Sequence, residues 1–300
     1  MAFSLCYLCT RVIGLKLLKK YYNLTKPGII YGNVLNATAG FLLASRYHIN
    51  LPLLAATLLG TSLVVASGCV FNNYLDREID KKMARTKQRA LVIKTISVRN
   101  ALIFATVLGI LGFTLLAVFT NWLVVVIGLI GFVDYVIIYG YAKRHSVHGT
   151  LVGSISGAVP ILAGYCAASG QLDSAAVIAF LLLAAWQMPH FYGIAMYRYD
   201  DYKRAGLPVM PVARGMLATK LQTLFYIVIF MAIASLLTIY HYTGYIYLAV
   251  MLLVGLAWFT KGVRLFNGKD DRLWGRKMFL FSLIVVLVMA VMLSLGARLP

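Results

Sequence analysis

The sequence predicts an all-α membrane protein, a single domain that crosses the bilayer nine times. Of its 300 residues, 61% are hydrophobic and 12% are charged, whereas soluble domains average roughly 45–50% apolar and about 25% charged residues. Its apolar residues form repeated runs of the length that a membrane-spanning helix needs, about 20 residues. Its 28 Lys and Arg residues far outnumber its 9 Asp and Glu residues. This composition excludes a soluble globule and a disordered chain.

Nine segments are apolar and long enough to cross a membrane as helices. In chain order they are 28–45, 51–74, 99–119, 121–142, 150–169, 174–197, 218–240, 244–260 and 278–297. The connections after the first, third, fifth and seventh segments are short and nearly uncharged, and those after the other segments are basic. Because nine helices use most of the chain, we expect one domain over residues 1–300.

The basic residues predict how the protein is oriented. Twenty-six of the 28 lie in the N-terminal segment and the basic connections, which leaves only Arg46 and Arg298 on the other side. By the positive-inside rule the N-terminus is cytoplasmic and the C-terminus is outside. Residues 1–22 carry their charges after their apolar stretch, unlike a secretory signal, and are interpreted as an interfacial helix on the cytoplasmic face. The excess of positive charge is thus assigned to the membrane, and no nucleic-acid partner is expected.

The clearest chemical pattern is at the end of the second segment. Asn72, Asp76 and Asp80 are spaced i, i+4, i+8 and would share one helical face. Two carboxylates and an amide oxygen are ligands that Mg²⁺ accepts, with water and substrate phosphates at the remaining positions. The alternative is a solvated helix end whose acids pair with Arg77 and Lys81.

Basic and aromatic residues follow in two places. Arg85 and Arg89 either anchor the loop at the membrane surface or bind an anionic leaving group, for which the arginine fork is suited. At the end of the fourth segment, Tyr139 and Lys143 fall on one helical face, with Arg144 adjacent.

Polar residues also occur inside apolar segments. Trp186 to His190 interrupt the sixth segment with an amide, a proline and a histidine, and such interruptions usually line a cavity. His190 is a metal or haem-iron ligand, a proton donor, or a hydrogen-bonded core histidine. Asp134 lies near the middle of the fourth segment, where a carboxylate must be protonated, paired or facing a cavity. The sequence names no partner for it.

Taken together, these residues resemble the intramembrane prenyltransferases of the UbiA superfamily, and within it the haem O synthases. The superfamily pattern N-x-x-x-D-x-x-x-D is matched by Asn72, Asp76 and Asp80, and its Y-x-x-x-K pattern by Tyr139 and Lys143. Stretches similar to those of haem O synthases are Leu24–Gly28, Lys143–Ser146 with Gly149 and Thr150, and Trp186–His190. The resemblance extends from about Tyr21 to the last segment.

The resemblance implies an activity and a set of roles. Such enzymes transfer the farnesyl group of farnesyl diphosphate to a vinyl group of protohaem IX, with addition of water, by Mg²⁺-assisted ionisation to an allylic cation. The implied catalytic residues are Asn72, Asp76, Asp80 and Lys143; the implied metal ligands are Asn72, Asp76, Asp80, Asp200 and Asp201. The implied diphosphate-binding residues are Arg85, Arg89, Lys143, Arg144, Arg198 and Lys203, and the implied haem-binding residues are Tyr139, Trp186 and His190.

One segment departs from the superfamily pattern. Many members carry a second D-x-x-x-D after the sixth span, whereas this chain has the adjacent acids Asp200 and Asp201. Two interpretations stay open: a second Mg²⁺ is held here by protein ligands, or Arg198 and Lys203 perform part of its work.

Two other functions are compatible with parts of the pattern. The nearer one keeps the chemistry and changes the acceptor to an aromatic quinone precursor. The more distant one is a membrane transporter with the acids as an ion site, although only Asp134 lies deep in a span. For the haem enzyme we expect the bacterial inner membrane rather than the mitochondrial one. Association with a downstream haem-modifying enzyme or a terminal oxidase assembly would fit its product.

Overall fold

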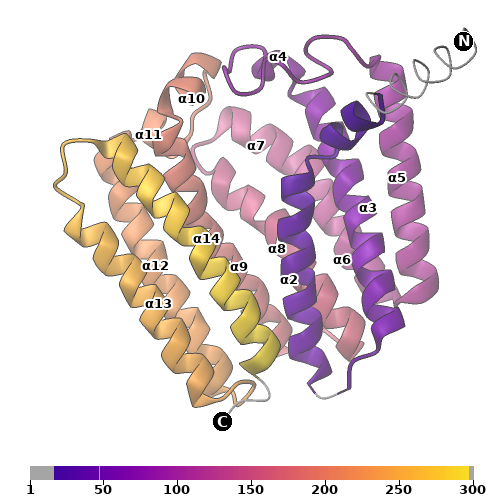
Figure 1. Ribbon diagram of the computed structural model, residues 1–300, viewed down its shortest axis with the longest axis vertical. Helices are drawn as coiled ribbons and strands as arrows, with labels where there is room; N and C mark the ends of the chain where they lie inside the picture. Colours follow the sequence, from indigo (N-terminus) through magenta and orange to yellow (C-terminus); the bar gives the residue numbers. More distant parts are fainter. Residues whose placement is uncertain (1–16, 47, 297–300) are drawn as a thin grey trace, which may run out of the picture.

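The computed structural model describes residues 17–46 and 48–296, and the long elements in this part of the chain are helices (Figure 1). Nine stretches of the described chain are long and apolar enough to cross a membrane, as the sequence predicts. They are α2 (Pro27–Ser45), α3 (Leu51–Leu75), α5 (Val98–Phe119), α6 (Trp122–Val133) continued by η1 (Asp134–Ile138) and α7 (Tyr139–His145), α8 (Gly149–Ser169), α9 (Ser174–Tyr197), α12 (Gly215–Ile239), α13 (Tyr245–Arg264) and α14 (Asp271–Gly296). Most of the predicted interfacial segment 1–22 lies outside the described residues.

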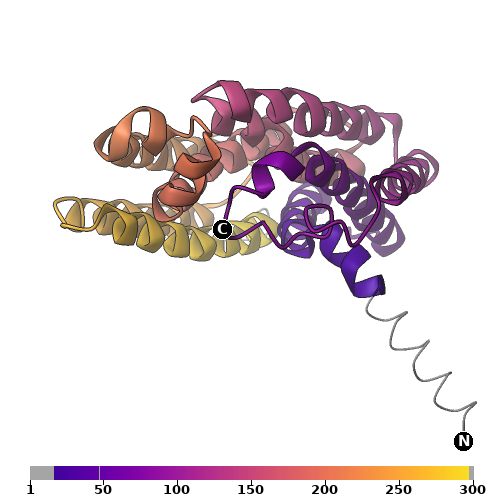
Figure 2. The ribbon, with the colours of Figure 1, turned by 90° about the horizontal axis from the view of Figure 1, so that it is seen from above.

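Three short helices lie at the end of the bundle that carries the basic connections, here called the basic end. They are α4 (Arg77–Asp80), α10 (Tyr199–Ala205) and α11 (Met210–Ala213). Seen from this end, α4 and α10 lie over the bundle (Figure 2). Met83 packs with Ala205 and Leu207 in a small apolar cluster, so the two basic connections form one cover.

α2 crosses α8 closely at two glycines. Gly40 of α2 faces the carbonyl oxygen of Ile161, and Gly164 of α8 faces the carbonyl oxygen of Ala37. A Cβ atom at either glycine would overlap the opposing backbone. Helices in membranes associate closely where small residues let their backbones approach. This reciprocal pair therefore fixes the spacing of two helices at the centre of the fold.

The fourth and sixth spans contain irregular features that the sequence only partly indicates. The fourth includes a π-helical turn, η1, and π turns inside α-helices are frequent at functional sites. Asp134 at its start is buried, and its Oδ2 accepts a hydrogen bond from the backbone N–H of Ser156 in α8, at 3.1 Å. In the sixth span, α9 continues as a helix through Pro189, so this proline does not end the helix.

Candidate active site

Asn72, Asp76 and Asp80 lie where α3 passes into α4 at the basic end. The backbone N–H of Asp76 donates to Asn72 O at 2.9 Å, and that of Asp80 donates to Asp76 O at 2.8 Å. These i to i+4 bonds carry the helical register through the junction, so the three side chains share one face as the spacing predicts. All three residues are buried, with exposed fractions of 3%, 8% and 4% respectively.

Cations from other elements bind both carboxylates. Lys143 Nζ of α7 is 2.5 Å from Asp76 Oδ2, and Arg144 Nη2 is 3.1 Å from Asp76 Oδ1. Arg89 Nη1, in the loop after α4, is 2.7 Å from Asp80 Oδ2. Hydrogen bonds between charged groups are roughly twice as strong as neutral ones, so these contacts orient the carboxylates firmly.

The acids do not pair with their basic sequence neighbours, as the alternative reading of this segment required. Lys81 Nζ is 2.7 Å from Glu78 Oε2, and Arg77 Nε is 3.7 Å from Glu78 Oε1. The hydrogen bond from Lys81 lowers the pKa of Glu78, an exposed carboxyl. Glu78 therefore binds Arg77 and Lys81, while Asp76 and Asp80 are buried and bind other cations. The partners of Asp76 are distant in sequence, and Asp80 binds Arg89 in the following loop.

Sequence reasoning missed Lys26, which belongs to the same cluster. It precedes α2 in a left-handed conformation, with φ of 54°, and its Nζ donates to Asn72 Oδ1 at 2.9 Å. Burial lowers the pKa of Lys26 to about 8, and the charges of Arg89 and Lys143 act in the same direction. The available signal was a lysine placed directly before Pro27 at the start of the first span.

Tyr139 lies beside this cluster. Lys143 Nζ is 5.2 Å from the centroid of the Tyr139 ring, which confirms that the two side chains share a face of α7. The Tyr139 ring stacks on that of Tyr135, with centroids 5.9 Å apart. The ring pair thus forms an aromatic wall next to the lysine that binds Asp76.

The acids of α10 have partners of their own. Asp200 forms two hydrogen bonds with the guanidinium of Arg272 in α14, at 2.6 and 2.9 Å. Asp201 Oδ1 accepts from Arg204 Nη2 at 2.7 Å and from the backbone N–H of Ala84 at 3.1 Å. These bonds tie α10 to α14 and to the loop after α4. A metal at Asp200 and Asp201 stays a prediction.

Three of the predicted diphosphate-binding cations make no ion pair with an acid in the described part of the chain. Arg198 lies over the Tyr197 ring at 4.5 Å, and Lys203 lies 5.7 Å from the centroid of the Tyr199 ring. Arg85 is exposed in the loop after α4. Their predicted role therefore depends on a ligand reaching them at the basic end.

Trp186 and His190 both face α14. Trp186 Nε1 donates to Ser282 O at 2.9 Å, and His190 Nδ1 lies 2.7 Å from Ser282 Oγ. The two rings stack with centroids 4.7 Å apart, and the Phe279 ring contacts His190 at 5.1 Å. Within the described residues, neither side chain has a ring contact or a hydrogen bond with Tyr139, which stacks on Tyr135 instead.

The cluster fits a magnesium ion that arrives with an anionic substrate. Among the described residues, no group of three or more His, Cys, Asp and Glu side chains could hold a metal by itself. Mg²⁺, however, is commonly bound by one or two carboxylates together with substrate phosphates and water. Asp76, Asp80 and the amide oxygen of Asn72 supply such a partial set. The buried Nδ2 of Asn72 also lacks a hydrogen-bond partner in the described chain.

Comparisons with known proteins agree with this geometry. The model of the UbiA prenyltransferase family matches residues 33–284. A protoheme IX farnesyltransferase of Klebsiella pneumoniae is 49% identical over 283 residues, which cover 94% of this chain and 96% of the relative. One of Yersinia pseudotuberculosis is 50% identical over 279 residues, covering 93% of this chain and 95% of the relative.

Solved structures share the fold. A digeranylgeranylglyceryl phosphate synthase has a TM-score of 0.77 at 21% identity, covering 93% of this chain and 98% of its own. A UbiA homologue of Archaeoglobus fulgidus, bound to GPP and Mg²⁺, has a TM-score of 0.72 at 18% identity, covering 92% and 99% of the two chains. With nine candidate spans, the N-x-x-x-D-x-x-x-D cluster and a family match over most of its length, the chain belongs to the UbiA prenyltransferase family.

Proposed function

We propose that this protein transfers the farnesyl group of farnesyl diphosphate to a vinyl group of protohaem IX and releases diphosphate. One observation carries the proposal: four cations converge on three buried oxygen-bearing side chains at the basic end. The cations are Lys26, Arg89, Lys143 and Arg144. The relatives that are about half identical over more than nine tenths of the chain support protohaem as the acceptor.

The cluster contains four cations and two carboxylates, so it has an excess of positive charge. This excess would bind a diphosphate and stabilise the negative charge that develops on its leaving oxygen. Mg²⁺ held by Asn72, Asp76 and Asp80 would neutralise further diphosphate charge. Lys143 and Arg144, held on Asp76, are placed to transfer their hydrogen bonds to phosphate oxygens.

The chemistry needs no nucleophilic side chain. The bond between farnesyl C1 and oxygen breaks, and its electron pair leaves with the diphosphate. The electron pair of the haem vinyl group then forms a carbon–carbon bond with the allylic cation. Water adds to the resulting cation and loses a proton, which gives a hydroxyethylfarnesyl side chain. The apolar interior protects the allylic cation from premature capture by water.

An assay with purified protein tests this function. Incubation with farnesyl diphosphate, Mg²⁺ and haem is expected to give a more hydrophobic haem on reversed-phase chromatography, with a mass increase of one farnesyl group plus one hydroxyl group. Parallel incubation with hydroxybenzoate tests the aromatic acceptor. Prenylated hydroxybenzoate without farnesylated haem would establish the alternative enzyme, and no product from either acceptor would contradict both.

The cellular location, the orientation in the membrane and the protein partners are also part of the proposal. A multi-pass membrane protein with enterobacterial relatives fits the bacterial inner membrane, with the basic end in the cytoplasm. A cysteine introduced at the exposed Lys82 is expected to react with a membrane-impermeant thiol reagent only in inverted vesicles. Co-purification with a terminal oxidase or a haem-modifying enzyme would test the predicted association.

Replacing Lys26 by Met is expected to raise the KM for farnesyl diphosphate at least about tenfold. The change removes one buried cation from the cluster, and a hydrogen bond to a charged group contributes about 1.5–3 kcal/mol. Steady-state kinetics at fixed haem measure the effect. The matched control is Lys82→Met, which removes an exposed lysine from the same end of the protein. An unchanged KM in Lys26→Met would remove Lys26 from the diphosphate site.

A further inference from the structure

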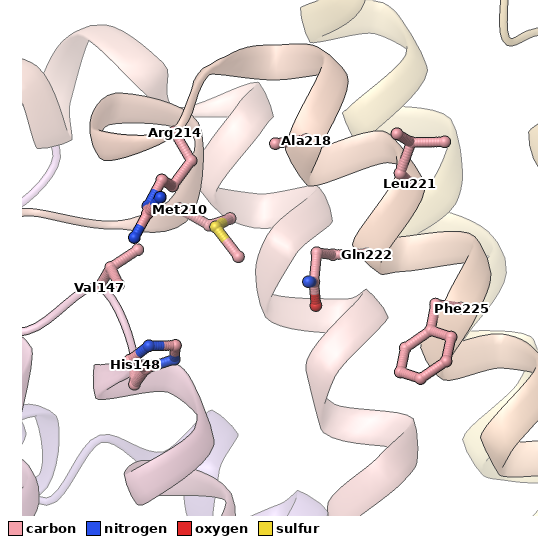
Figure 3. A pocket seen from close by; sticks show the side chains of 8 residues that line it. All are labelled: Val147, His148, Met210, Arg214, Ala218, Leu221, Gln222 and Phe225. Atoms are coloured by element: carbon pink, nitrogen blue, oxygen red, sulfur yellow. The ribbon is translucent and has the colours of Figure 1, made fainter.

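A groove of about 600 Å³ lies outside the cluster described above, between the corner that joins α7 to α8 and the helices α11 and α12 (Figure 3). Val147 and His148 of the corner form one wall, and Met210, Arg214, Gln222 and Phe225 are among the residues opposite. Figure 3 shows the Met210 thioether and the His148 ring on either side of the space, with the Gln222 amide between them in height. The volume is in the range of small-molecule and cofactor sites.

The groove is cationic, and three of its polar side chains have no protein partner among the described residues. Within the described residues, the guanidinium of Arg214, the ring of His148 and the amide of Gln222 make no hydrogen bond or ion pair. Arg214 and His148 are exposed, and no acidic residue is among those that line the groove. An anionic group would therefore meet a free arginine there without a competing carboxylate.

Two helix N-termini increase this preference for an anion. α8 begins at Gly149 and α12 at Gly215, directly after His148 and Arg214. Neither N-terminus has a side-chain cap. Uncapped N–H groups and the helix dipole both favour negative charge at such positions. They support the arginine, which remains the main anion-binding group.

The groove supplies the side-chain types that a haem needs. Haem iron is held in proteins by His or Met side chains, and His148 and Met210 both line the space. The porphyrin plane requires apolar and aromatic walls, which Val147 and Phe225 provide. The propionates require a cation at the water-facing edge, which Arg214 provides. A phospholipid would use the cation and the apolar walls but has no use for the histidine and the thioether.

We propose that this groove docks the haem acceptor, with Arg214 pairing a propionate and His148 or Met210 facing the iron. The proposal rests on the function proposed above. The groove adjoins the catalytic cluster through its wall: a Cβ atom on Gly149, next to His148, would lie 2.7 Å from the Cα atom of Lys143. Near the α7–α8 corner, Lys143 binds Asp76, and Val147 and His148 line the groove.

This placement differs from the one predicted around His190. The His190 ring is enclosed by Trp186 and Phe279 and hydrogen-bonded to Ser282, so it already has the surroundings of a core histidine. His148 has none of these contacts and is exposed to the groove. We therefore expect replacement of His148 to weaken haem binding and replacement of His190 to leave it unchanged.

Haem titration of the purified full-length protein, without farnesyl diphosphate, tests the proposal through the Soret absorbance. Arg214→Gln and His148→Ala are each expected to weaken haem binding at least about tenfold, because each removes a contact to a charged or coordinating group. His148→Ala or Met210→Leu should also change the Soret position. Arg264→Gln, an exposed arginine at the end of α13, is the matched control and should bind haem as the parent does.

Kinetics separate this proposal from the function on which it rests. If the parent protein forms no farnesylated haem, the proposed function fails. If it does, Arg214→Gln should raise the KM for haem and leave that for farnesyl diphosphate unchanged, which also shows that the variant is folded. Unchanged haem affinity in both groove variants would overturn the proposal, as would loss of binding in His190→Ala alone. Loss of co-purified anionic phospholipid in Arg214→Gln, with haem affinity intact, would reassign the groove to lipid and also overturn it.

Discussion

Asp76→Asn is expected to lower kcat for farnesylated haem at least about 100-fold, while the protein still inserts into the membrane. The carboxylate is the shared partner of Lys143 and Arg144, and it is one of the three expected metal ligands. The amide cannot balance two cations, so the diphosphate would meet a misplaced cluster. Removing one group that stabilises charge in a transition state typically costs about 10²–10³ in kcat.

Glu78→Gln is the matched control for this loss. Glu78 lies two residues from Asp76, but its carboxylate is exposed, and its ion-pair partners among the described residues are Lys81 and Arg77. We expect near-parental turnover in this variant, since surface ion pairs contribute little. Turnover from haem and farnesyl diphosphate, normalised to the protein that elutes as a single peak in detergent, measures both variants. Equal activity in the two would show that Asp76 has no part in the reaction.

Gly164→Ala is expected to destabilise the protein strongly, because the new methyl group would overlap the backbone carbonyl of Ala37. Overpacking usually costs about 1–3 kcal/mol, and here the obstacle is main chain, which does not move aside as a side chain can. The α2–α8 crossing would have to open. We expect the variant to aggregate at a lower temperature than the parent protein in detergent. Size-exclusion chromatography of heated samples measures this temperature.

Gly32→Ala provides the comparison for the glycine substitution. Gly32 is also in α2, but a Cβ atom there would meet no atom within 4 Å. Alanine in a helix interior is favoured over glycine by roughly 0.5–1 kcal/mol, so this variant should be at least as stable as the parent. If Gly164→Ala were as stable as Gly32→Ala, the close crossing would not exist in solution.

The sequence predicted the spans because the information for them is local. A run of about 20 apolar residues must cross the bilayer as a helix, and all nine predicted spans are present in the described chain. The shared face of Asn72, Asp76 and Asp80 was predictable for the same reason, since helical periodicity needs only the spacing. α14 begins at Asp271, before the predicted residue 278. An apolar run could not indicate the first turns of this helix, because they contain charged residues.

The partners of these side chains were not predictable, because they are set by packing between distant segments. Lys26 and Asn72 are 46 residues apart, and Asp201 and Ala84 are separated by 117. Asp134 accepts a hydrogen bond from a main-chain N–H of α8. Every residue except proline has this group, so residue identities could not indicate the partner. Charge counting placed these groups at one end of the bundle, but only the fold decides which cation meets which carboxylate.

The pairing of Asp76 with Lys143 and Arg144 has a consequence for the site before a ligand binds. Buried carboxylates without partners are costly, and so are buried cations. Here each offsets the other before any ligand arrives, so most of the dehydration of Asp76 and Lys143 takes place when the chain folds. A ligand that arrives later exchanges one ionic partner for another. Ligand binding at this site therefore replaces ionic contacts that already exist, and no new cluster of charges has to be assembled.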